Sequence, residues 1–78
     1  SSVSQFTQLQ KKWPEGTRIR SMKVDHRNPN LLRLDIETEK PLDKKRARKL
    51  QALLNNHFGR PMEVEIHQKI IVRVGPLQ

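Results

Sequence analysis

The strongest candidates for chemistry are cations crowded into the middle of the chain. Five of the six residues from 44 to 49 are basic: Lys44, Lys45, Arg46, Arg48 and Lys49. At the start of a helix, such cations oppose the macrodipole and repel one another at spacings of three and four residues. A bound anion would remove both penalties, so the run predicts a polyanion-binding site. A solvated basic face that serves only solubility explains the same run equally well.

A second basic group precedes this run, and it consists of Lys11, Lys12, Arg18, Arg20 and Lys23. Trp13 adjoins two of these cations, and an exposed indole there could stack on a nucleic-acid base. However, Trp13 also completes an apolar stripe at helical spacing, which favours a place in the core. Aromatic residues make up only 4% of the chain, which argues against a platform of several stacking rings.

Catalytic chemistry has little support in the sequence. The chain has no Cys and no Tyr, and it lacks both a G-x-S-x-G motif and a glycine-rich phosphate loop. His26, His57 and His67 lie in different segments without the spacing of metal ligands. Glu63 and Glu65 could imitate a catalytic carboxylate pair, but beside so many cations they are expected to balance surface charge. We therefore expect a protein that is not an enzyme, with no catalytic residue, no metal and no cofactor.

Composition narrows the class of protein further. The chain has 78 residues, a formal net charge of +8 and 33% apolar residues, enough for one small core. Its longest apolar run, residues 70–72, is far below the roughly 20 residues that span a bilayer, so no transmembrane segment is expected. The first residue is Ser, which suggests a fragment of a longer protein. The expected location is the cytoplasm, or the cytoplasmic side of a membrane.

Proline and glycine divide the chain into five segments. Residues 2–13 carry an apolar residue every three or four positions, which predicts a helix. Residues 17–24 predict a strand in which apolar and polar residues alternate imperfectly. Residues 32–37 predict a half-buried strand, and the short turn-rich connection between the two predicts a hairpin. A second helix is expected from a cap at Asp43 to Phe58, where Gly59 and Pro61 end it. Residues 62–74 alternate like a strand. A fully extended strand of that length would measure about 43 Å, which is too long for so small a domain. The strand must therefore project from the domain, bend, or turn back near His67.

These segments predict one small α+β domain over residues 1–78, in the order α-β-β-α-β. Two helices would cover one face of a mostly antiparallel sheet of three or four strands, and the other face would be wet. The expected core combines the apolar faces of the strands and the second helix: Leu34, Ile36, Leu50, Leu54, Phe58, Val64 and Ile66.

The order of the elements resembles that of the small ring-building domains of bacterial secretion and sporulation assemblies. That resemblance implies side-by-side assembly of copies. The K homology domain of RNA-binding proteins also combines such units, but its GxxG loop is missing, because residues 56–59 contain only one glycine.

The sequence thus leaves two functions open. The first is a basic module that binds a polyanion, nucleic acid in first place, through Lys44, Lys45, Arg46, Arg48 and Lys49 together with Arg18, Arg20, Lys11 and Lys12. The alternative is an interaction or self-assembly domain of a larger protein, including one anchored in a membrane. Under that alternative, the partner is another protein or the chain's own edge strand.

Overall fold

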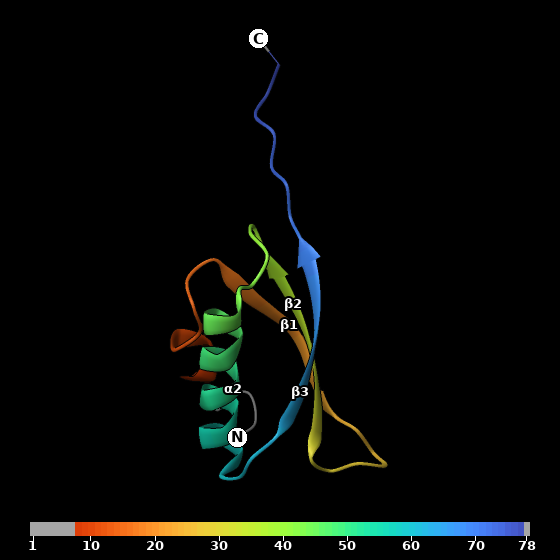
Figure 1. Cartoon of the computed structure of the whole chain (residues 1–78). Coiled ribbons are helices and arrows are strands. Elements are labelled where there is room, and N and C mark those ends of the chain that lie inside the picture. The colour runs from red at the N-terminus through yellow and green to blue at the C-terminus, as the bar shows by residue number, and fades with distance from the viewer. Residues whose placement is uncertain (1–7, 78) are drawn as a thin grey trace.

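The computed structural model describes residues 8–77 of the chain. Three strands and one long helix are defined: β1 (Thr17–Val24), β2 (Leu31–Thr38), α2 (Lys44–Phe58) and β3 (Glu63–Ile70). Residues 8–11 ahead of them are helical, which agrees with the end of the expected first helix. The part of that prediction at positions 2–7 lies outside the described residues. Figure 1 shows α2 and the chain before β1 on the same side of the sheet.

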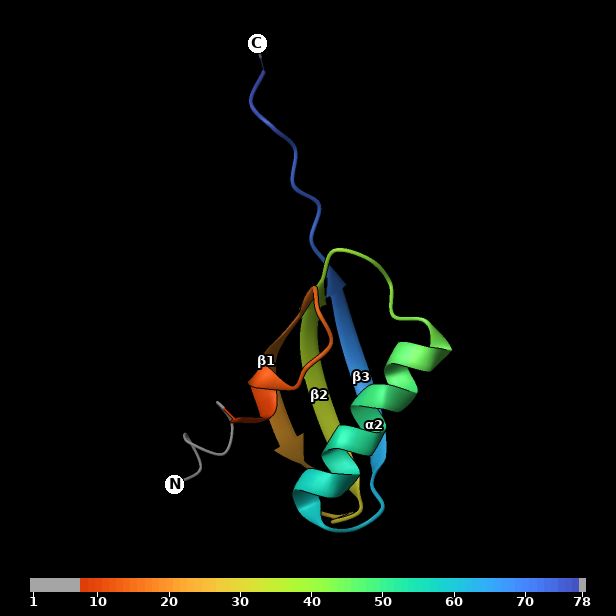
Figure 2. The same ribbon diagram turned by 90° about the vertical axis from the view of Figure 1, so that its left-hand side faces the viewer.

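The strands form one mixed sheet in the order β1-β2-β3, and this corrects the expected mostly antiparallel sheet. β1 and β2 are antiparallel, as the expected hairpin requires. β2 and β3 are parallel, because α2 carries the chain back to the end of the sheet where β2 begins. No fourth strand occurs within residues 8–77, since β3 ends at Ile70 and the following residues run on beyond the sheet (Figures 1 and 2).

A β-bulge explains the imperfect alternation of β1. Ile19 is opposite Ile36 and Ser21 is opposite Asp35, so Arg20 is an extra residue in the strand. The insertion shifts the pleat by one position, and Met22 therefore faces the same side as Ile19 although the two are three residues apart. Both arginines that flank Ile19 remain exposed.

The core lies between α2 and one face of the sheet. Leu34 and Ile36 of β2 and Leu50 and Leu54 of α2 are buried together, as the sequence predicted. Phe58, Val64 and Ile66 are only partly buried against this cluster. The structure adds five buried residues to it: Leu9, Trp13, Ile19, Leu32 and Met62.

Both ends of α2 form as the sequence predicted. The side chain of Asp43 accepts a hydrogen bond of 2.7 Å from the backbone N–H of Arg46 and so caps the first turn. Gly59 adopts a left-handed conformation with φ of 71°, and its N–H donates to the carbonyl of Asn55. These caps fix where the basic run begins and hold it within the first turns of a helix.

Candidate nucleic-acid interface

Four of the five basic residues in the first half of α2 are exposed, and no acid lies among the five in the sequence. Lys44, Lys45, Arg48 and Lys49 are exposed, whereas Arg46 is half-buried. The first turn contains no acidic residue, so Asp43 alone offsets the opposition between these cations and the helix dipole. Within residues 8–77, none of these cations lies within 4.0 Å of a carboxylate oxygen.

The cations occupy two flanks of α2. Lys45 and Lys49, one turn apart, border the turn before β1. Lys44 and Arg48 continue the row of Gln51 and Asn55 at the spacing of a helix turn. The Gln51 side chain donates to the Met62 carbonyl (3.2 Å), and the Asn55 side chain accepts from the Met62 N–H (2.8 Å). This second flank therefore faces the chain that enters β3.

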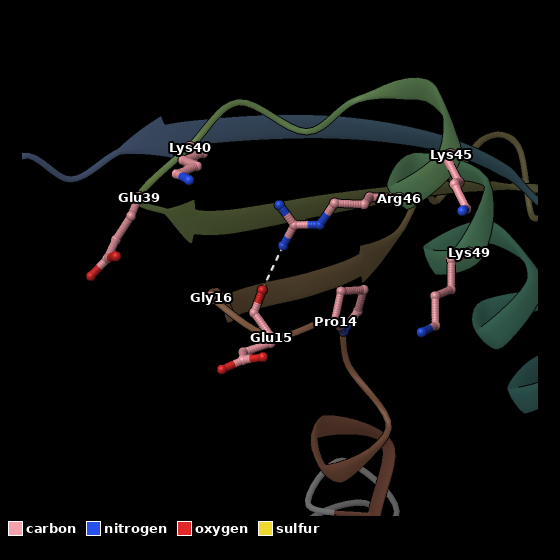
Figure 3. Close-up of a pocket in the computed structure, with 8 residues that line it drawn as sticks. All are labelled: Pro14, Glu15, Gly16, Glu39, Lys40, Lys45, Arg46 and Lys49. Carbon is pink, nitrogen blue, oxygen red and sulfur yellow. Dashed lines mark hydrogen bonds between the residues drawn. The ribbon is translucent and has the colours of Figure 1, made fainter.

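Arg46 has a structural contact that separates it from the other cations. Its Nη2 donates to the carbonyl oxygen of Glu15 (Figure 3) and also, at 3.2 Å, to Oγ1 of Thr17. The guanidinium thereby ties α2 to the turn that precedes β1. It remains at the wall of the basic hollow, but it is already fixed by protein acceptors.

A shallow hollow of about 690 Å³ lies between α2 and the turn before β1. Figure 3 shows side chains from the two elements and from the loop after β2 around it. Its lining combines four cations with two acids and two small residues: Lys40, Lys45, Arg46, Lys49, Glu15, Glu39, Pro14 and Gly16. Lys40 is an addition to the site that sequence reasoning missed. Its only signal was its position just ahead of the capped helix.

A second hollow brings Lys12 to the C-terminal half of α2. Its lining includes Lys12, Leu53, Asn56 and His57. Position 53 follows position 49 by one helical turn, so this hollow continues along the flank that carries Lys45 and Lys49. The structure therefore brings Lys12 to the same side of the molecule as the α2 cations. Lys11 is exposed beside it but does not line the hollow.

Arg18 and Arg20 extend from the face of the sheet opposite α2, so the structure does not bring them together with the helix cations. Arg18 is opposite Glu37 in the β1–β2 register. Nε of Arg20 lies 3.3 Å from the carboxylate of the same Glu37. The reason is the pleat of β1, which turns Ile19 into the core and its neighbours outward.

The outer face of the sheet is balanced by its own acids. The Arg33 guanidinium bonds to the carboxylate of Asp25 and, at 2.8 Å, to that of Glu65. The Glu65 carboxylate also lies 3.4 Å from Nε2 of His67. The Arg33 hydrogen bond lowers the pKa of Asp25, helped by the backbone N–H groups of Asn28 and Arg27. The same bond raises the pKa of Arg33.

Residues 8–77 contain no cluster of three or more His, Cys, Asp or Glu side chains that could hold a metal ion. In the same range, no helix is long and apolar enough to cross a membrane.

The described chain is a small α+β fold with a mixed sheet and a basic helix. Compared with known proteins, it matches no protein-family model, no curated protein and no solved structure. Its function is therefore inferred from the charges and contacts of its own residues.

Proposed function

We propose that this chain is a non-enzymatic module that binds a polyanion, nucleic acid in first place, through the exposed cations of α2. One observation supports the proposal above all: among the described residues, the carboxylates that form ion pairs contact basic side chains of the strands and the hairpin, and none contacts a cation of α2. On this proposal the module acts in the cytoplasm or at the cytoplasmic side of a membrane.

The binding residues are Lys44, Lys45, Arg48 and Lys49, assisted by Lys12 and Lys40. Phosphate groups placed along α2 would relieve the repulsion between neighbouring cations and the conflict with the helix dipole. They would also release condensed counterions, which is the main source of sequence-independent affinity for nucleic acid. Arg46 contributes to the positive potential, but its contacts with Glu15 and Thr17 give it a structural role.

Recognition on this proposal is directed at the phosphate backbone and not at the bases. Trp13 is buried and Phe58 is half-buried, so neither ring is available as an exposed stacking platform. Phosphate contacts fix the position of a protein on nucleic acid but carry little sequence information. We therefore expect similar affinities for duplexes of unrelated sequence.

Two variants of equal charge test this assignment. The helix variant replaces Lys44, Lys45, Arg48 and Lys49 by Gln, and leaves Arg46 in place to preserve the tether. The matched control replaces four exposed cations of the outer face by Gln: Arg18, Arg20, Lys23 and Lys69. Each removes four positive charges from a chain of net charge +8.

Affinity for a short fluorescent duplex at low salt distinguishes the two faces. We expect the helix variant to bind at least about tenfold more weakly, and the control to lose much less, since long-range charge alone has a smaller effect than direct phosphate contact. Equal losses in the two variants would contradict a site on α2. Absence of binding by the unmodified chain at low salt would remove the proposed function altogether.

A further inference from the structure

The outer edge of β3 offers unpaired backbone groups. In the part of the chain that the structure describes, β3 is the last strand of the sheet and pairs only with β2. The N–H groups of Glu63 and Ile71 donate at 2.8 Å toward the β2 side, to Asn30 and Thr38. Because backbone groups alternate along a strand, the N–H and C=O groups of residues 64, 66, 68 and 70 face the free edge. No backbone group of residues 8–77 pairs with them there.

The segment after β3 exposes apolar side chains that no element within residues 8–77 covers. Ile70 is 41% exposed, Val72 79% and Val74 83%. The chain continues the direction of β3 beyond the sheet in an extended form, and both views show it projecting away from the body (Figures 1 and 2). An edge strand that continues into an exposed β-favouring segment is a template for pairing with another strand.

On the α2 side of this strand, the residue types that follow Gln68 nearly mirror those that precede it. Before it stand Met62, Val64 and Ile66, and after it stand Ile70, Val72 and Val74. A pattern that mirrors itself fits an antiparallel copy of itself, because a two-fold axis exchanges position 68 + n with position 68 − n.

We propose that two copies of this chain pair antiparallel through the edge of β3 and the segment after it, with a two-fold axis at Gln68. The axis places Val72 of one copy opposite Val64 of the other, and Ile70 opposite Ile66. The backbone groups of Val64, Ile66 and Ile70 face the free edge, and Val72 continues the same alternation beyond β3, so this register forms hydrogen-bonded pairs. The exposed apolar side chains after β3 are thereby covered by their mirror partners.

Charge on the outer face agrees with this register. Glu63 of one copy stands opposite Arg73 of the other, and the symmetry gives this ion pair twice. The self-mirroring pattern is the reason to assign the edge to a second copy and not to a different protein. The contact is closed by symmetry, so it yields a dimer with one continuous sheet and not a growing filament. Pairing through β3 is independent of the proposed binding of a polyanion.

Sedimentation of the unmodified chain at several concentrations tests the pairing. We expect a concentration-dependent dimer, and a dissociation constant at least about tenfold higher for Val72→Lys, because the substitution places a charge in the centre of the apolar contact. The matched control is Leu77→Lys, which adds the same charge at a fully exposed position outside the mirrored pattern. A strict monomer at high concentration, or equal effects of the two substitutions, would overturn the self-pairing and leave the edge to a different partner.

Cross-linking tests the register, since the chain has no cysteine of its own. The axis at Gln68 puts His67 of one copy opposite Lys69 of the other in a pair that is not hydrogen-bonded. Such Cα atoms are about 4.5 Å apart, within the range that a disulfide can bridge. A mixture of His67→Cys and Lys69→Cys chains should therefore cross-link much faster than either variant alone. Faster cross-linking of Lys69→Cys with itself would overturn this axis.

Discussion

The side chain of Arg46 reaches from the first turns of α2 to the backbone carbonyl of Glu15, 31 residues away in sequence. Its neighbours Lys45 and Lys49 border the same hollow but have no such acceptor within the described chain. One cation of the basic run thus stabilises the fold, while the cations beside it remain available to a ligand.

This difference predicts opposite phenotypes for two similar substitutions. Arg46→Gln should lower the free energy of unfolding by about 1–2 kcal/mol, because it removes hydrogen bonds from a charged donor. Lys49→Gln should leave stability within about 0.5 kcal/mol of the unmodified chain and weaken nucleic-acid binding instead. Chemical denaturation and duplex titration of both variants check this. Equal stability of the two variants would contradict the tether.

Leu54 is fully buried between α2 and the sheet, so its truncation tests the core. Leu54→Ala should cost on the order of 2–5 kcal/mol, a large part of the stability of so small a domain. Leu77→Ala is the matched leucine truncation at a fully exposed position and should change stability very little. A nearly unchanged melting curve for Leu54→Ala would show that this face of α2 is not the core.

We expect the Asp25 carboxylate to make a pH-dependent contribution to the stability of the fold at the hairpin. Its folded-state pKa is lowered below the usual 3.8, mainly by the Arg33 hydrogen bond. The carboxylate therefore stabilises the fold at pH values above 3.8, and this contribution is lost as the pH falls below 3.8 through the lowered pKa.

The measurement is the melting temperature of Asp25→Asn against the unmodified chain as a function of pH. The two should differ at neutral pH and converge in acid below the ordinary aspartate range. Glu39→Gln serves as the control, since Glu39 has no ion-pair partner among the described residues. A difference that stays constant down to strong acid would rule out the ionised carboxylate as its source.

Gly59 and Gly75 provide a matched pair for backbone conformation. A Cβ at either position would meet no atom within 4 Å, but only Gly59 has a positive φ, of 71°. Gly59→Ala should therefore cost about 1 kcal/mol by strain in the helix cap alone. Gly75→Ala should cost nothing measurable in the same denaturation experiment. Equal stabilities would mean that the left-handed cap is not required.

Local sequence signals predicted the helices and strands well, but they did not predict how the strands pair or in which register. Asp43 and Gly59 bound α2 because capping chemistry is carried by single residues near each end. The parallel pairing of β3 depends on how α2 packs across the sheet, which no local pattern encodes. In the sequence, the bulge at Arg20 is visible only as an irregular alternation of apolar and polar residues, because a bulge is defined by the register with the neighbouring strand β2.

The same distinction between local and long-range relationships applies to the candidate site. The run from Lys44 to Lys49 is visible in sequence because its residues are neighbours. The separation of Arg18 and Arg20 from α2 could not be predicted from the sequence, because it depends on which side chains of β1 turn into the core. Lys40 and the tether of Arg46 likewise become visible only when the turn before β1 is placed beside α2.

The salt dependence of duplex binding is the sharpest test of a polyanion site on α2. If four phosphates are neutralised on B-form DNA, log K against log salt should have a slope near −3.6, or about a 150-fold loss of affinity between 50 and 200 mM salt. Lys49→Gln should reduce the slope by about 0.9, and an unrelated duplex sequence should leave it unchanged. A slope near zero, or one indifferent to removal of the α2 cations, would contradict a polyanion site on this helix.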